Sequence, residues 1–119
     1  MYHVVIPGEL PDLNTVINAS KGHWGGYSKE KAQWTRHVAL LCSTLPQLES
    51  CALAFKWFVR NRRKDPDNIV FAKKYVLDGM VEAGVIQNDG WKEVVSFKDE
   101  WEVDADNPRV EVSIWEAGA

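Results

Sequence analysis

Three aspartates are the side chains of this 119-residue chain whose spacing best suits metal chemistry. Asp65 and Asp67 stand two positions apart in the segment Arg-Asn-Arg-Arg-Lys-Asp-Pro-Asp-Asn, directly after four basic side chains in five positions. Asp89 follows further along, in the segment Asn-Asp-Gly. Carboxylates that converge on one point repel one another unless a hard cation lies between them. A fold that brings the three together would create an oxygen-only site for a divalent metal ion.

Each aspartate also has a plain structural interpretation. Asp65 precedes Pro66, and an Asp N-cap followed by proline at the first helical position is a common helix start. A carboxylate at Asp67 would be favoured by the helix dipole, and residues 88–90 are typical of a turn. The helix-start interpretation leaves unexplained the second aspartate, followed by Asn68, directly after a basic segment.

One lysine is predicted to share the face of Asp67. At about 100° per residue, Asp67, Lys74 and Asp78 fall within about 60° of one another on a helix, whereas Lys73 lies on a different face. Asn68, Asp78 and Asn88 are candidates for supporting the metal ligands, with purely structural roles as the alternative.

The charges of the chain are divided between its two halves. Residues 21–64 have a net charge of +7 and residues 65–119 a net charge of −8, within a total of −3. A basic surface beside an acidic cluster suits an enzyme that holds DNA phosphates and metal cations, although charges also segregate by chance between solvated faces.

These side chains need a fold that returns Asp89 to the start of a helix. Apolar periodicity and turn signals predict a strand over 3–6, an irregular segment over 9–27 and a helix over 28–43. A strand over 53–59 and a helix over 65–83, ended by Gly84, are predicted next. Strands over 94–103 and 109–115 are predicted to close the fold as a hairpin. The order β-α-β-α-β-β predicts a single α+β domain over residues 1–119, with two helices packed on a small mixed sheet. If residues 85–86 fold back along the second helix, Asp89 approaches Asp65 and Asp67.

Taken in order, these motifs resemble the RusA family of Holliday-junction resolvases, which are crossover-junction endodeoxyribonucleases. The matching motifs are Asp65-Pro-Asp67-Asn68, Lys74-Tyr-Val-Leu-Asp78-Gly-Met and Ala83-Gly84-Val-Ile-Gln-Asn88-Asp89. Pro7, Asn14, Lys21, Tyr27, Lys31 and the closing hairpin also fit the family, so the resemblance covers nearly the whole chain.

The resemblance implies metal-dependent hydrolysis of phosphodiester bonds in branched DNA by a homodimer, in DNA recombination and repair. It implies that the catalytic aspartates are Asp65, Asp67 and Asp89 and that the essential lysine is Lys74, which would stabilise negative charge on a scissile phosphate. The candidate DNA-binding residues are then Lys21, Lys31, Arg60, Arg62, Arg63 and Lys64. Small stand-alone resolvases of this type are often carried by phages and prophages. The segment between Asp67 and Lys74 is longer here than in the best-known members, which places Lys74 about 4.5 Å further along the helix.

Oxygen ligands favour Mg²⁺, with Mn²⁺ as the alternative, over zinc, and His3, His23 and His37 form no zinc pattern with the cysteines. We expect no organic cofactor. The absence of a leader and of an apolar run of about 18 residues predicts a cytoplasmic protein without membrane contact. Cys42 and Cys51 are expected to be reduced.

Two other functions remain open from the sequence. One is a DNA-binding module of the same fold that does not cut. The other is a partner-binding protein whose tryptophans mark an interface. The expectation for most of the six tryptophans is nonetheless the core: Trp24, Trp34, Trp57, Trp91, Trp101 and Trp115. The last two strands and the segment 9–27 are the expected dimer surfaces.

Overall fold

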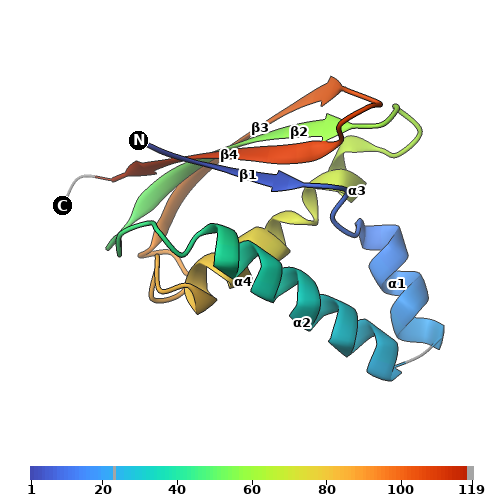
Figure 1. Cartoon of the computed structure of the whole chain (residues 1–119), viewed down its shortest axis with the longest axis horizontal. Helices are drawn as coiled ribbons and strands as arrows, with labels where there is room; N and C mark the ends of the chain where they lie inside the picture. Colours follow the sequence, from blue (N-terminus) through green and yellow to red (C-terminus); the bar gives the residue numbers. More distant parts are fainter. Residues whose placement is uncertain (23, 118–119) are drawn as a thin grey trace.

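A four-stranded mixed sheet covered on one face by helices forms the protein (Figure 1). The computed structural model describes the backbone of residues 1–22 and 24–117, and the side chains of that range except residues 19–28. Within it the elements are β1 (Tyr2–Pro7), α1 (Leu13–Gly22), α2 (Trp24–Leu41), β2 (Cys51–Val59), α3 (Pro66–Val70), α4 (Lys73–Glu82), β3 (Val94–Val103) and β4 (Arg109–Glu116). The α+β class and the mixed sheet predicted from the sequence are confirmed.

The strand order is β1-β4-β2-β3, and it contradicts the predicted closing hairpin. β4 runs antiparallel to both β1 and β2, so it lies in the interior of the sheet. β3 pairs only with β2, in parallel, and forms an edge. The turn at 104–108 therefore carries the chain past the end of β2, where the Asp104 N–H donates to the Val59 carbonyl at 2.8 Å. A short turn between two strands predicts a hairpin, but here β2 lies between β3 and β4 in the sheet.

The parallel pairing of β2 and β3 determines where the candidate site lies. Parallel neighbours need a crossover, which here contains α3 and α4. The basic segment 60–64 leaves the carboxyl end of β2 and leads directly into α3. This topology places the basic segment and Asp65 together at one end of the sheet.

The core lies between the sheet and the helices. Alternate residues of β2 and β4 point into it, and the fully buried set includes Leu53, Phe55, Val112 and Ile114. The helices α2 and α4 pack closely at Gly79, where the absence of a side chain leaves room for Val38. A Cβ atom at Gly79 would overlap the Val38 side chain. The glycine after Asp78 therefore has a packing role in the helix contact.

Two helix predictions need correction. Residues 13–22 form α1 instead of a loop, because Asp12 caps it: the Thr15 N–H donates to Asp12 Oδ1 at 2.7 Å. The next helix begins at Trp24 instead of Ser28.

The helix predicted over 65–83 is divided into α3 and α4. Around Phe71 the hydrogen bonds tighten to i→i−3, as in the 3.1 Å bonds from the Ala72 N–H to the Ile69 carbonyl and from the Lys74 N–H to the Phe71 carbonyl. The backbone of Phe71 and Ala72 stays in the right-handed helical region, so the two helices are divided by a local tightening of the hydrogen bonds.

The tryptophans are less buried than expected. Among those with described side chains, Trp57 is fully buried and Trp34 packs at the margin of the core, whereas Trp91, Trp101 and Trp115 are exposed. Trp24 lies outside the described side chains. Cys42 and Cys51 are both free and buried, as expected for reduced thiols. None of the helices in the described residues has the length and apolarity needed to span a membrane.

Candidate active site

An ion-pair cluster centred on Lys74 joins two of the sequence motifs. The Lys74 ammonium lies 2.7 Å from Asp89 Oδ2 and 3.1 Å from Asp78 Oδ1. The hydrogen bond from Lys74 holds the pKa of Asp89 below its usual value, and the same bond raises the pKa of Lys74. Both carboxylates are partly buried, so the cluster is a defined electrostatic feature at the surface of α4.

The end of α4 explains how Asp89 returns to Lys74. The Gly84 N–H donates to the Val81 carbonyl at 3.0 Å, and the Val85 N–H donates to the Met80 carbonyl at 2.9 Å. This is the Schellman pattern, and Gly84 takes the left-handed conformation it requires, with φ of +80°. The chain consequently reverses, Val85 and Ile86 enter the core, and the turn that carries Asp89 lies back along α4.

Lys73 points to a different part of the molecule. Its ammonium lies 2.7 Å from Asp99 Oδ2 and over the rings of Phe55 and Phe97, at 5.1 and 4.3 Å from their centroids. Asp99 also accepts a hydrogen bond from Trp57 Nε1 at 2.9 Å. The predicted separation of the two lysines onto different faces is confirmed, and Lys73 belongs to a structural network that holds β3 to the helices.

Asp65 and Asp67 lie at the start of α3, and both side chains are exposed. Asp65 is the N-cap residue, with Pro66 next as predicted, but its carboxylate makes no capping hydrogen bond. Asp67 Oδ1 accepts a hydrogen bond from the Asn68 N–H at 3.0 Å.

The three aspartates suit a hard cation by donor type but do not form a ready site. No group of three His, Cys, Asp or Glu side chains close enough to hold a metal ion occurs among the described residues. The structure brings Asp89 to Lys74, one turn beyond the end of α3, and not into a three-carboxylate group with Asp65 and Asp67. In this conformation the spacing of the ligands therefore does not fit a three-carboxylate metal centre.

Asn68 and Asp12 fasten α3 and the basic segment to α1. Asn68 is only 8% exposed, and its Oδ1 accepts a hydrogen bond from the Asn14 N–H at 3.0 Å. Asp12, only 4% exposed, pairs with the Lys64 ammonium at 2.6 Å. Burial by itself would raise the pKa of Asp12, but the hydrogen bonds from Lys64 and from Thr15 lower it below the usual value. The sequence interpretation missed Asp12, although an Asp before an amphipathic segment is a helix-start signal.

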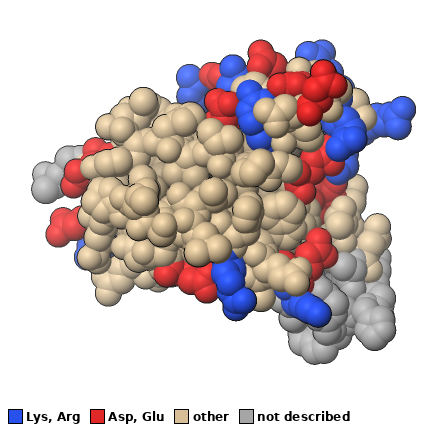
Figure 2. Space-filling view, in the orientation of Figure 1, with Lys and Arg blue, Asp and Glu red and all other residues tan. Residues whose placement is uncertain are grey.

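The candidate DNA-binding residues differ in whether a nearby carboxylate already pairs with their positive charge. Charged side chains crowd the end of the molecule where β2 leads into α3, whereas the middle of the face in Figure 2 is uncharged. The Arg60 Nε lies 3.4 Å from Glu9, and Lys31 lies 3.8 Å from Asp78. Arg62 and Arg63 form no ion pair with any residue that the structure describes. The side chain of Lys21 lies outside the described residues.

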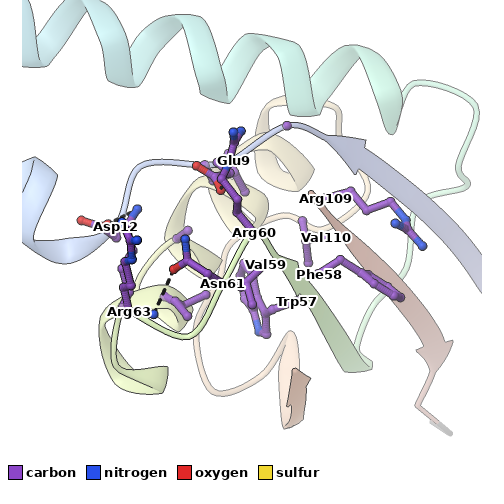
Figure 3. Close-up of a pocket in the computed structure, with 15 residues that line it drawn as sticks. Glu9, Asp12, Trp57, Phe58, Val59, Arg60, Asn61, Arg63, Arg109 and Val110 are labelled. Atoms are coloured by element: carbon purple, nitrogen blue, oxygen red, sulfur yellow. Dashed lines mark hydrogen bonds and ion pairs between the residues drawn. The ribbon is translucent and has the colours of Figure 1, made fainter. Parts of the chain in front are cut away.

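A cavity of about 290 Å³ opens beside this basic segment (Figure 3). Glu9, Arg60 and Asn61 gather on one side of it, and the Asn61 Oδ1 accepts a hydrogen bond from the Arg63 N–H at 3.0 Å. Arg109 points away from this group and lies over the ring of Phe58, at 3.7 Å from its centroid. The cavity is thus lined by cationic side chains of the basic segment 60–64 and by apolar side chains of β2.

The chain matches a known protein family. The model of a family described as RusA, endodeoxyribonuclease RusA, matches residues 15–115 of the chain. No curated protein matches the chain.

Proposed function

The chain belongs to the RusA endodeoxyribonuclease family, and from this premise we propose that it cleaves phosphodiester bonds in branched DNA, with the four-way junction as its substrate. Residues 1–119 would act as one endonuclease domain. The observation that supports the assignment of the site is the 2.7 Å pair between the Lys74 ammonium and Asp89 Oδ2, because it joins two of the motifs found in the sequence at one surface.

We further propose that cleavage depends on Mg²⁺, or alternatively Mn²⁺, held by Asp65, Asp67 and Asp89. A bound divalent ion would lower the pKa of a water nucleophile and neutralise charge that develops on the phosphate. Binding of one ion by all three aspartates would require Asp89 to lie closer to Asp65 and Asp67 than it does in the present conformation. Lys74, which contacts Asp89 Oδ2, would stabilise negative charge on a phosphate bound at the same surface.

The remaining residues have supporting roles in this proposal. Arg62 and Arg63 are the cations of segment 60–64 without a carboxylate partner in the described chain, so they are best placed to bind backbone phosphates. Arg60 and Lys64 would exchange Glu9 and Asp12 for phosphate only at the cost of breaking existing pairs. Lys21 and Lys31 would extend the contact along the DNA.

A four-way junction has approximate two-fold symmetry, and its resolution needs two cuts. One chain with one set of the three aspartates would supply one active site. We therefore propose a two-fold symmetric homodimer, the commonest form of oligomer. The setting we propose is DNA recombination and repair in the cytoplasm, with a phage or prophage as the source, and no membrane or organic cofactor is required.

A labelled four-way junction tests this proposal directly. Incubation with the protein and Mg²⁺ should give paired nicks at symmetric positions, and chelation of the metal should abolish them. A linear duplex of the same sequence is the control for branch selectivity. Absence of cleavage with either metal ion, together with intact junction binding, would favour a non-catalytic DNA-binding module of the same fold.

A further inference from the structure

A second cavity, of about 310 Å³, lies against Asp65. Its apolar part is formed by the side chains of Val59, Pro66, Ile69, Trp101 and Val103. This volume is at the lower end of the range for small-molecule sites, roughly 300–1,000 Å³. It suits one flat ring system and is far too small for a duplex.

Trp101 is exposed because of its position at the edge of the sheet. It lies opposite Trp57 in the register of β2 and β3, yet Trp57 is 4% exposed and Trp101 is 43% exposed. The helices cover β2 and leave the outer strand β3 open (Figure 1). On the same face, Asp99 is occupied by Lys73. A large aromatic ring therefore stands beside Val103 without a covering layer.

The rim of the cavity is polar and carries both signs of charge. Arg62, which forms no ion pair with a described residue, lines the cavity together with Asn61 and Glu102. Glu102 follows Trp101 in β3, so its side chain lies on the opposite face of the sheet, where the Lys56 ammonium is 4.0 Å away. Arg62 can bind a phosphate, and the amide of Asn61 can bind the donors and acceptors on a base edge. Asp65 belongs to the same rim.

We propose that this cavity binds one unstacked nucleobase of the DNA strand that passes Asp65, with the base stacked on the indole ring of Trp101. The inference rests on the proposed function, because it takes Asp65 to mark the path of the cleaved strand. Aromatic stacking with cations along the backbone is the usual way in which proteins hold single-stranded nucleic acid. Bases at the crossover of a junction are the ones that can leave the helical stack.

A thermodynamic cycle between Trp101 and the DNA tests the proposal. Binding of a four-way junction is measured by fluorescence anisotropy in the presence of chelator, so that no cleavage is needed. The wild-type protein and Trp101→Ala are each compared on an intact junction and on a series with a single abasic site near the crossover. Loss of one stacked base is worth about tenfold or more in affinity.

We expect Trp101→Ala and one particular abasic position each to weaken binding by about tenfold, and their combination to weaken it by no more than either alone. Such non-additivity means that the residue and the base act on each other. Trp101→Phe should retain most of the affinity. The matched control is Trp115→Ala, which removes a tryptophan of almost equal exposure, 42%, that does not line this cavity. Trp115→Ala should bind as wild type.

Other outcomes overturn the inference in distinguishable ways. Suppose that the wild-type protein cleaves the junction, but Trp101→Ala binds it unchanged, or the affinity losses from Trp101→Ala and from the abasic site are strictly additive. Either result would exclude the base site and leave the proposed nuclease activity intact. A Trp101→Ala protein that has become monomeric by light scattering would assign the ring to a second copy of the chain. Failure of the wild-type protein to bind any branched DNA would instead overturn the proposed function itself. If circular dichroism shows that Trp101→Ala is unfolded, Trp101→Leu keeps the apolar bulk without the stacking face and takes its place in the cycle.

Discussion

The Lys74 ammonium lies 2.7 Å from Asp89 Oδ2, although the two residues are fifteen positions apart in the chain and most of α4 lies between them. The pair depends on the reversal at Gly84, which returns the turn at 88–90 to the first turn of the helix. It also means that the lysine proposed for catalysis and a carboxylate proposed as a metal ligand neutralise each other in the protein without DNA.

Replacement of the two neighbouring lysines should separate activity from stability. Lys74→Ala should lower the rate of junction cleavage by about 10²-fold or more, the scale of one lost transition-state contact. Lys73→Ala should leave the rate nearly unchanged but lower the free energy of unfolding by about 1.5–3 kcal/mol, because the Lys73 ammonium and Asp99 are only 14% and 19% exposed. Single-turnover cleavage and urea denaturation measure the two effects. The reverse ordering would show that Lys73 is the catalytic lysine.

Asp67→Asn should abolish cleavage and leave junction binding within about threefold of wild type. The change keeps the shape of the side chain but removes the charge that a metal ligand needs. Asp106→Asn, in the exposed turn before β4, is the matched control and should cut normally. A fully active Asp67→Asn protein would exclude Asp67 from the site.

The buried Asp12 should make stability depend on acid pH. Its pKa lies below the usual value of 3.8, so its contribution is complete above that pH and is lost as the pH falls through the lower folded value. Asp12→Asn should reduce the free energy of unfolding by about 1–3 kcal/mol at pH 7. We expect this difference to shrink at pH 3 in urea titrations. An equal difference at both values would mean that Asp12 acts through its shape and not through its charge.

The cysteines should resist modification in the folded protein. Burial raises the pKa of Cys42 to about 11 and also raises the pKa of Cys51, so little thiolate exists at pH 8. A chromogenic disulfide reagent should therefore react with both thiols only after denaturant is added. Rapid reaction in native buffer would indicate that the helix layer opens locally.

The protein should behave as a dimer in solution. Light scattering at micromolar concentration should give twice the 13.5 kDa mass of one chain, with or without junction DNA. Two active sites related by a two-fold axis would then meet strands of like polarity. A mass near 13.5 kDa that persists with the junction present would leave an enzyme that nicks one strand at a time.

Much of the local structure could be predicted from the sequence. β3 occupies the predicted range 94–103, Asp65 and Pro66 begin a helix, and Gly84 ends the next one. The separation of Lys73 from Lys74 followed from helical periodicity alone. These features depend on neighbours three or four positions apart, or on the backbone preferences of single residues, and a sequence displays both directly.

The arrangement of the site was decided by contacts between distant residues. The insertion of β4 between β1 and β2, the pairing of Asp12 with Lys64, and the exposure of Trp101 left no periodic signal in the sequence. Strand order depends on which edges pair across the whole chain, and no local pattern encodes that choice. The sequence determined which residues carry carboxylates, cations and aromatic rings. The tertiary structure decided that Asp89 meets Lys74 and that Trp101 stands uncovered beside Asp65, because only the packed sheet and helices set the distances between them.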